Sequence, residues 1–182
     1  NYDGEITVWC VDDAGNESVS EKVRVRMDTT KPQVDTGKAE PAVWTKENVV
    51  VSGIVSDAEV NGAVSNVKTV MYKYNNGEDK VATFDGSKYT IEIPKQDYKG
   101  DVSVWCIDNA GNISAIKNTA VKMDVTAPAN VEIKYTESLP SKFINMITFG
   151  FYSIDKPLTV TISATDNLAL DEIKYTVSGV KG

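Results

Sequence analysis

Apolar residues alternate with polar ones along many short stretches of this chain. Residues 5–11 alternate in this way, and residues 22–27 do so more cleanly, with valines and a methionine between charged residues. A period of two is typical of half-buried β-strands. The segment between them contains Asp12–Asn16, a run of turn formers in which Gly15 or Asn16 can take the positive φ that a turn requires. The pattern predicts a β-hairpin.

The same hairpin pattern returns later in the chain. Residues 5–18 read Glu-Ile-Thr-Val-Trp-Cys-Val-Asp-Asp-Ala-Gly-Asn-Glu-Ser, and residues 101–114 read Asp-Val-Ser-Val-Trp-Cys-Ile-Asp-Asn-Ala-Gly-Asn-Ile-Ser. The offset is 96 residues, and Met27 and Met123 keep it. A period of this size indicates one small β-domain per repeat.

Residues 32–125 hold the one complete unit that the repeat defines. Short strand patterns follow one another through it, near residues 33–36, 49–57, 70–74, 81–84, 89–93, 101–107 and 119–123. About seven short strands with turns between them, and no convincing helical pattern, predict an all-β fold, an antiparallel β-sandwich.

The two ends of the chain are expected to be partial units. We interpret residues 1–31 as the last two strands of one unit and residues 126–182 as the N-terminal part of another. Residues 158–166 align with the strand at 49–57, and residues 173–177 align with the strand at 70–74. The sequence therefore predicts strands at both places.

The last unit contains an apolar and aromatic insertion. Asp166 lies 109 residues after its counterpart Asp57, so 13 residues are added to the 96-residue period, near residues 139–152. Phe143 and Ile147 have a spacing that fits one or two helical turns. We expect the insertion to pack over an open end of its own sandwich, with an exposed interaction patch as the alternative.

Composition narrows the class of partner. The chain has 182 residues and a formal net charge of −7, and its 19 Lys and Arg residues are scattered singly. Nucleic acid and anionic membrane surfaces both require clustered basic residues, so neither is an expected partner. No apolar run approaches the roughly 18 residues that span a bilayer, so we expect no membrane insertion.

The two cysteines occupy equivalent places in two repeats. Such positions lie too far apart for a disulfide, which needs Cα atoms within about 7 Å. Cys10 and Cys106 each continue the apolar face of a strand, where cysteine behaves as a small hydrophobic residue. We predict that both are buried thiols.

Three motifs together carry a family resemblance. Trp44-Thr45 leads into the strand that begins at Asn48, the sequence Trp-Cys-x-Asp-x-Ala-Gly-Asn occurs twice, and Asp-x-Thr-x-Pro follows each copy at 28–32 and 124–128. This order resembles the immunoglobulin-like repeats of Gram-positive surface and secreted proteins. Residues 149–166 look like a second subtype from the same proteins. The cysteine departs from the family pattern, because alanine, valine or threonine is commoner there.

The resemblance implies tandem immunoglobulin-like sandwiches with an extracellular location, either secreted or attached to the cell wall. It implies a structural spacer that presents other modules, whose partners are the other domains of the same polypeptide. The alternative is an adhesin-type module that binds host glycan or protein. Trp9, Trp44 and Trp105 are the side chains that could stack on sugar rings, although repeat tryptophans more often cover a sandwich edge.

No catalytic, cofactor-binding or metal site is predicted. The chain has no histidine, the commonest general base near neutral pH, and we expect a protein that is not an enzyme. The turn carboxylates, Asp12, Asp57, Asp108 and Asp166, are interpreted as acceptors of backbone N–H bonds. Calcium is the alternative, and Asp28 and Asp124 at the unit junctions are its better candidates.

Overall fold

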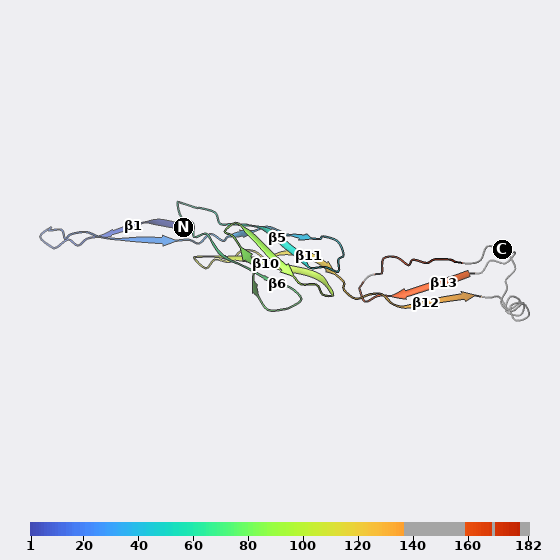
Figure 1. Cartoon of the computed structure of the whole chain (residues 1–182). Helices are drawn as coiled ribbons and strands as arrows, with labels where there is room; N and C mark the ends of the chain where they lie inside the picture. The colour runs from blue at the N-terminus through green and yellow to red at the C-terminus, as the bar shows by residue number, and fades with distance from the viewer. Residues whose placement is uncertain (137–158, 169, 179–182) are drawn as a thin grey trace, which may run out of the picture. The chain divides into compact units, whose positions relative to one another are not determined.

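The computed structural model describes residues 1–136, 159–168 and 170–178 (Figure 1). These residues belong to two compact units, Asn1–Val125 and Thr126–Gly182. The predicted all-β fold is confirmed, because every regular element of the described residues is a strand and the paired strands run antiparallel. Within those ranges, no helix has the length and apolar character needed to cross a membrane.

The first unit begins with a hairpin of β1 (Tyr2–Val8) and β2 (Glu21–Met27). Tyr2 lies opposite Met27 and Val8 lies opposite Glu21. In the connecting turn, the Asp12 carboxylate accepts N–H bonds from Ala14 and Asn16 at 3.0 and 2.8 Å. Gly15 has a φ of 86°, which confirms one of the two predicted positions for the positive φ.

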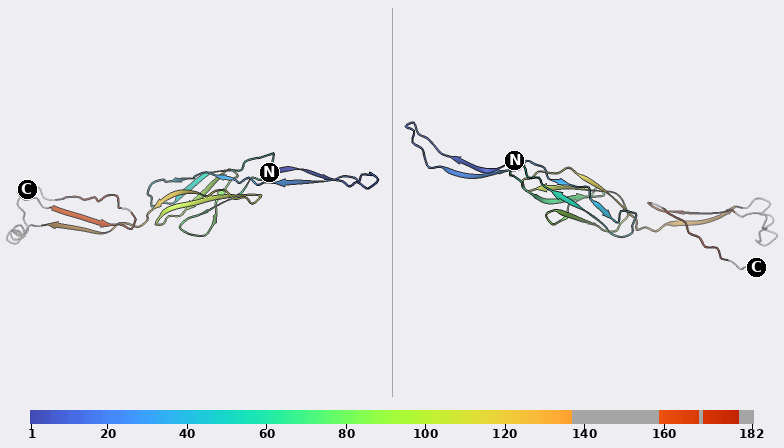
Figure 2. Two further views of the ribbon diagram at one scale, coloured as in Figure 1. Left: turned by 180° about the vertical axis from the view of Figure 1, so that it is seen from behind. Right: turned by 90° about the horizontal axis from the view of Figure 1, so that it is seen from above.

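Two sheets make up the rest of this unit (Figure 2). One has the order β3-β5-β9-β8, with β4 also paired to β5, and the other has the order β11-β10-β6-β7. The strands of the first sheet are β3 (Gln33–Val34), β4 (Lys38–Glu40), β5 (Val49–Ser56), β8 (Thr83–Phe84) and β9 (Lys88–Ile93). Those of the second are β6 (Val67–Lys73), β7 (Lys80–Val81), β10 (Tyr98–Asp108) and β11 (Lys117–Met123).

The structure therefore has more strands in residues 32–125 than the sequence pattern predicted. The single strand expected over residues 81–84 is divided into two strands, β7 and β8, because the chain passes from one sheet to the other at Ala82. Ala82 is buried, and its N–H donates to the Val70 carbonyl at 2.9 Å. The strand expected near residues 33–36 is the two-residue strand β3, and β4 is a further strand that the sequence pattern did not predict.

The core lies between the two sheets. Alternate residues of β5 and β9 meet alternate residues of β6, β10 and β11, as the period of two requires. The hydrophobic residues of the core that are at most 2% exposed are Val49, Val51, Val70, Tyr89, Ile91, Ile93, Val102, Val104, Cys106, Val121 and Met123. The predicted inward faces of the strands at 49–57 and 101–107 are confirmed.

The repeated sequence motif folds into the same hairpin twice. In β10–β11, Tyr98 lies opposite Met123 and Val104 lies opposite Lys117, which is the register of β1–β2 shifted by 96 residues. The turn is also the same, since Gly111 has a φ of 94°. Local sequence is sufficient to specify this hairpin in both copies.

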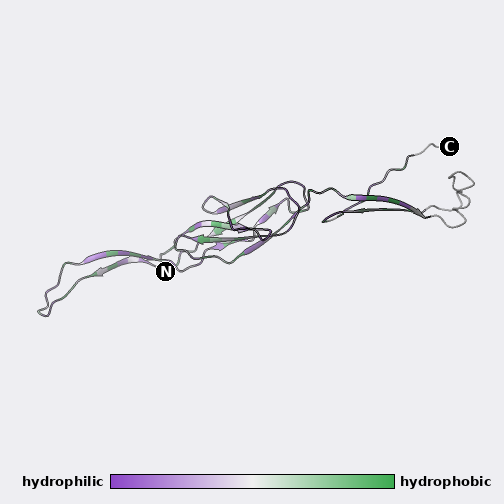
Figure 3. Cartoon of the chain, turned by 90° about the horizontal axis from the view of Figure 1, so that it is seen from below, coloured by the Kyte–Doolittle hydropathy of each residue, from purple (hydrophilic) through white to green (hydrophobic). Residues whose placement is uncertain are grey.

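The two hairpins differ in what covers their apolar faces. Val104 is 1% exposed, whereas its counterpart Val8 is 57% exposed, and the alternation of hydrophobic and hydrophilic residues along the ribbon can be followed in Figure 3. The strands β5 and β9 pack over β10–β11, and no described strand packs over β1–β2 in the same way. The prediction that both cysteines are buried is therefore wrong for Cys10, which is exposed, while Cys106 is buried.

The second unit contains β12 (Ala129–Thr136) and β13 (Thr159–Thr165), paired antiparallel with Ile133 opposite Ile162. The predicted strand at 158–166 is therefore confirmed. The strand predicted at 173–177 is wrong, because these residues are exposed and have no ladder partner among the described residues. The insertion at 139–152 lies outside the described residues, so its predicted helical turn and packing stay predictions.

Candidate functional site

Three carboxylates that are distant in sequence meet at one end of the first unit. Asp57 follows β5, Asp108 ends β10, and Asp28 follows β2 of the hairpin. One oxygen atom from each carboxylate lies within 4.8 Å of the other two. We call this group the acidic cluster.

Asp28 connects the hairpin to the sandwich. Its Oδ2 accepts a 2.7 Å bond from the Ser65 N–H, and its Oδ1 accepts bonds from the Thr30 N–H and the Asn1 side-chain amide at 2.9 Å each. The hydrogen bonds from Ser65 and then from Thr30 lower the pKa of Asp28 below its ordinary value, because they favour the ionised form. Asp28 is therefore an anion held in place by donors from both sides of the junction.

Asp108 is fully buried and is held by its own turn. Its Oδ1 accepts the Asn112 N–H and its Oδ2 accepts the Asn112 side-chain amide, both at 2.8 Å. Asn112 also donates its side-chain amide to the main-chain carbonyl of Asp28 at 3.0 Å. The turn after β10 therefore fixes both Asp108 and the chain segment that carries Asp28.

Asp57 is the member of the acidic cluster whose carboxylate accepts the fewest hydrogen bonds from the described residues. Its Oδ1 is buried and has no hydrogen-bond partner among the described residues, while the Ser65 hydroxyl donates to Oδ2 at 3.4 Å. Burial, and then the negative charges of Asp28 and Asp108, raise the pKa of Asp57 above its ordinary value. The cluster therefore favours a proton, or another positive charge, at Asp57.

The chemistry open to this group follows from its charge and its ligand atoms. Carboxylate oxygens are the ligands that hard cations such as calcium take, and calcium binds six to eight oxygens. Three carboxylates supply part of such a set, and none of the side chains that hold them in place is a cation. The donor set therefore fits a hard cation in type, and Asp28, Asp57 and Asp108 are the residues that would hold it.

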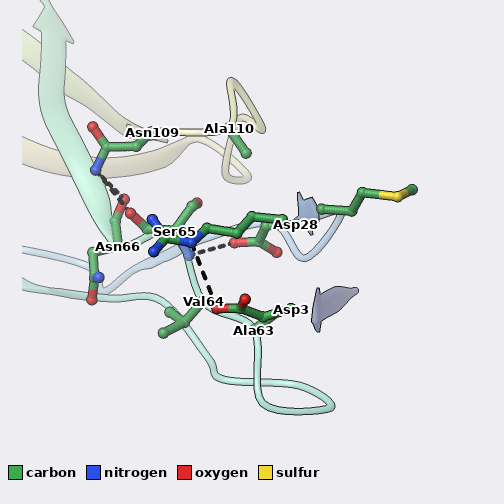
Figure 4. Close-up of a pocket in the computed structure, with 10 residues that line it drawn as sticks. Asp3, Asp28, Ala63, Val64, Ser65, Asn66, Asn109 and Ala110 are labelled. Atoms are coloured by element: carbon green, nitrogen blue, oxygen red, sulfur yellow. Dashed lines mark hydrogen bonds and ion pairs between the residues drawn. The ribbon is translucent and has the colours of Figure 1, made fainter. Parts of the chain in front are cut away.

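A cavity of about 400 Å³ lies beside Asp28 where the hairpin meets the sandwich (Figure 4). Its lining residues are Asp3, Arg26, Met27, Asp28, Ala63, Val64, Ser65, Asn66, Asn109 and Ala110. The Asn109 side-chain amide donates to the carbonyls of Ser65 and Asn66 at 2.8 and 3.2 Å, and so closes one side of it. The junction is thus polar and hydrogen-bonded, with a hollow of small-molecule size.

The structure brings together only some of the predicted carboxylates. Asp28, Asp57 and Asp108 meet in the acidic cluster, whereas Asp12 remains in the hairpin turn, where Asn16 binds it. The Asp124 N–H donates to the Thr45 carbonyl, and Asp166 accepts the Leu168 N–H at 3.0 Å. The prediction of turn carboxylates that accept backbone N–H bonds is confirmed for Asp12, Asp108 and Asp166.

Sequence reasoning missed the polar residues that build the junction. Ser65 and Asn66 lie in a stretch without strand periodicity, and Asn109 and Asn112 looked like ordinary turn formers. The available signal was the run Asn61-Gly62, a turn dipeptide that returns the chain towards Asp57. Asn61 and Asn66 both have positive φ, near 52° and 63°.

The three tryptophans do not form one surface. Trp9 is exposed in the uncovered hairpin, Trp105 is partly buried with the Lys73 ammonium 6.0 Å from its ring centre, and Trp44 has Lys99 at 5.9 Å. Cations placed over tryptophan faces occupy the surface on which a sugar would stack. Among them, Trp9 alone has no such lysine partner in the described structure.

Comparison with known proteins identifies no relative. No protein-family model matches the chain, and no curated protein matches it either. The fold and the junction therefore carry the functional argument by themselves.

Proposed function

We propose that this chain is a non-catalytic structural spacer, built from immunoglobulin-like repeats, in a bacterial surface or secreted multidomain protein. In this role it presents other modules of the same polypeptide outside the cell. The observation that carries the proposal is the junction at Asp28, where the end of one repeat is bonded to the loops of the next. A spacer needs such a junction because an unrestrained linker would let consecutive units move independently.

The junction bonds come from both repeats. Asn1, Asp28 and Thr30 belong to the hairpin side, and Ser65 and Asn112 belong to the sandwich side. Pro32 follows within a few residues and removes one backbone N–H while restricting φ. Hydrogen bonds plus a proline-restricted linker favour a fixed arrangement of one repeat on the next.

The repeated hairpin supports a serial design. The N–H groups of Cys10 and Cys106 each donate a 2.9 Å bond to the hydroxyl oxygen of the serine eight residues later, Ser18 and Ser114 respectively. Asp12 and Asp108 hold their turns with the same pair of bonds. A hairpin that recurs in such detail at a fixed period indicates a protein built by adding similar units. Each added unit makes such a protein longer.

The test is a reach assay on a cell surface. The whole chain is placed between a membrane anchor and an epitope, and binding of antibody-coated beads is compared with a flexible Gly/Ser segment of 182 residues. We expect the chain to present the epitope to larger beads than the flexible segment does. Equal bead binding by the two would overturn the spacer function.

A second candidate function is glycan binding, and the observation that favours it is the exposed indole of Trp9. Exposed tryptophans stack on sugar rings through their apolar faces. The test is a glycan array probed with the whole chain and with Trp9→Ala. A signal that the substitution removes would favour an adhesin module, and the absence of any signal would remove this candidate.

A further inference from the structure

The sheet β11-β10-β6-β7 brings together basic residues that are scattered along the sequence. Six exposed lysines lie on its four strands, and they are Lys68, Lys73, Lys80, Lys99, Lys117 and Lys122. The acidic residues of the same strands are Asp101 and the fully buried Asp108. The strands of the other sheet carry two lysines and two glutamates. One sheet is therefore basic in a chain of net charge −7, and an anion is its complementary partner.

Three of these lysines lie on one half of the outer face of the sheet. Lys99 on β10 lies opposite Lys122 on β11, and Lys73 on β6 lies opposite Ser103 on β10. The buried residues that alternate with them point into the core, so the lysine side chains point outward. Like charges directly opposite on a strand pair are destabilising. The pair of Lys99 and Lys122 therefore favours an anion over this face.

The first copy of the hairpin does not have this excess of positive charge. Asp3 occupies the place of Lys99 there, and it forms ion pairs with Arg24 at 2.8 Å and with Arg26 at 3.8 Å. In the second copy Ala120 stands in the place of Arg24. Within the described part of the chain, the lysines of the outer face form no ion pair. Their charge is therefore not neutralised within the described fold.

A hollow of about 530 Å³ lies along β10 beside two of these lysines. It lies where β6 ends at Lys73 while β10 begins at Tyr98, so that residues 98–102 pair with β11 alone. Its lining includes Lys73, Tyr74, Asn76, Lys99, Asp101 and Ser103. All its lining residues belong to the complete repeat, residues 32–125.

The shape of the hollow is fixed by main-chain geometry. Asn75 and Asn76 turn the chain with φ values of 53° and 51°, and the Asn75 N–H donates to the Tyr98 hydroxyl at 3.4 Å. The Tyr98 hydroxyl donates to the Asp101 carbonyl at 2.8 Å. It lies so close to Gly100 that a Cβ there would come within 2.8 Å of its oxygen. A hollow that is already formed costs little ordering when a ligand binds.

The two ammonium groups of the hollow are held at separate places. Lys73 and Lys99 are four residues apart in the register of β10, which is about 13 Å along a strand. The Lys73 Nζ lies 6.0 Å from the ring centre of Trp105, and the Lys99 Nζ lies 5.9 Å from that of Trp44. Each indole attracts its own lysine by a cation–π interaction. One small anion cannot contact both groups in these positions, whereas a chain with repeated negative groups can.

The rest of the lining fits hydroxyl groups. The Asn76 side-chain amide can donate and accept hydrogen bonds, and the Asp101 carboxylate and the Ser103 hydroxyl oxygen can accept them. Asp101 lies between the two lysines along β10, where it would repel the closely spaced phosphates of a nucleic acid. The lining therefore matches a chain that is rich in hydroxyls and carries negative groups at intervals.

We propose that this hollow binds an acidic polysaccharide along β10. Its successive carboxylate or sulfate groups bind Lys99 and Lys73. The sugar hydroxyls between them bind Asn76, Asp101 and Ser103. The indoles hold the lysines and do not stack on the sugar. This binding goes beyond the spacer function and does not depend on it, and it uses a different surface from the exposed indole of the first hairpin.

Calorimetric titration of the whole chain tests the proposal. The probes are oligogalacturonates, which carry carboxylates, and dextran sulfate of similar length, with neutral dextran as the uncharged control. We expect binding of a charged probe and none of neutral dextran, and galacturonate monomer should bind at least about tenfold more weakly than its oligomer, since only the oligomer reaches both lysines. The charged probe that binds more tightly identifies the anionic group.

Substitutions locate the binding in the hollow. Lys73→Gln and Lys99→Gln should each weaken binding about fivefold, which is the size of one exposed charge contact. The matched control is Lys38→Gln, which removes the same charge from the other sheet and should leave the affinity unchanged. All three lysines are exposed, so none of these variants is expected to unfold the chain. In NMR spectra, the charged probe should shift the Ser103 amide.

Three results would overturn the proposal. Equal weakening by Lys38→Gln would show a general attraction of charges and no site in the hollow. Equal affinity for single-stranded DNA of the same charge would overturn the polysaccharide as the ligand. Binding of neither charged probe by the folded chain would overturn the site itself.

Discussion

The Asp28 carboxylate accepts the Ser65 N–H at 2.7 Å, and this bond connects the end of β2 to the loop that follows β5. It is the shortest of the bonds that Asp28 accepts, the others being 2.9 Å from Thr30 and Asn1. A charged acceptor strengthens a hydrogen bond relative to a neutral one. The Asp28 carboxylate therefore contributes a charge-assisted bond to the attachment of the hairpin.

Replacement of this acceptor should loosen the junction and leave the sandwich folded. In Asp28→Ala we expect the Ser65 amide to exchange with solvent several-fold faster in hydrogen-exchange NMR. The control is Asp85→Ala, which removes a similar acceptor from the Ser87 and Lys88 amides in another turn. An unchanged Ser65 rate in Asp28→Ala would show that other contacts hold the junction.

The same bond has a defined pH dependence. Since the pKa of Asp28 is lowered on folding, its contribution to stability is complete above the ordinary value of 3.8 and is lost as the pH falls through the lowered value. The Ser65 amide of the unsubstituted chain should therefore stay protected at pH 4 and lose protection only in stronger acid. Loss of protection well above pH 4 would contradict this assignment.

Asp57 should behave in the opposite way. Its pKa is raised on folding, so the folded state binds the proton more tightly, and stability falls as the pH rises from 3.8 through the raised value. Asp57→Asn removes the charge that Asp28 and Asp108 repel. With a chelator present, we expect this variant to melt a few degrees higher than the unsubstituted chain at pH 7 and at the same temperature as it near pH 3.

Calcium distinguishes the two roles of the acidic cluster in the same experiment. If the three carboxylates hold a hard cation, millimolar calcium stabilises the unsubstituted chain more than Asp57→Asn, and the order of the melting temperatures reverses. If they only repel one another, calcium changes both proteins equally. Asp85→Asn serves as the control for general effects of losing one negative charge.

The local parts of the structure were predictable from sequence. Val49 and Val51 alternate with outward residues, and both are buried in the core. The turn at Gly15 takes positive φ as its composition indicates. These features depend on neighbours within a few residues, and the sequence contains those neighbours.

The non-local parts were not predictable for a physical reason. Cys10 has the same local sequence as Cys106, yet its burial depends on strands that lie outside the motif. Residues 173–177 have a strand pattern, but a strand also needs a partner for its backbone groups. Asp57 and Asp108 were recognised separately, and only the sandwich topology shows that β5 and β10 end at the same place.

The difference between the two cysteines leads to a labelling prediction. Burial raises the pKa of the Cys106 thiol and keeps reagents away from it, whereas Cys10 is exposed. At low protein concentration, one equivalent of a maleimide should add to the folded chain at the rate of a free thiol, and a second should add only in denaturant. In Cys10→Ser, the folded chain should take up none, as measured by intact mass. Rapid double labelling without denaturant would contradict the buried position of Cys106.

Tyr89 makes the strongest prediction about the core. Its hydroxyl is buried without a hydrogen-bond partner among the described residues, and it lies so close to Gly53 that a Cβ there would come within 2.6 Å of it. A buried polar group without a partner costs about 1–3 kcal/mol. Tyr89→Phe removes the hydroxyl and keeps the ring, so we expect the free energy of unfolding in urea to rise by about 1 kcal/mol. A fall in this free energy would contradict the unpaired state of the hydroxyl.

The same substitution should change how the free energy of unfolding depends on pH in alkaline solution. Burial, and then the charge of Asp35, raise the pKa of Tyr89 to about 12. The unfolded chain ionises this phenol near pH 10.0, so the folded state loses stability relative to it as the pH rises from 10.0 towards about 12. Tyr89→Phe lacks this titration, and the gap in stability between the variant and the unsubstituted chain should therefore widen over that range. Absorbance titration at alkaline pH provides the direct check: burial also raises the pKa of Tyr98, so the unsubstituted chain should show one more late-ionising phenol than Tyr89→Phe does. A Tyr72→Phe control, at a partly buried tyrosine, should retain it.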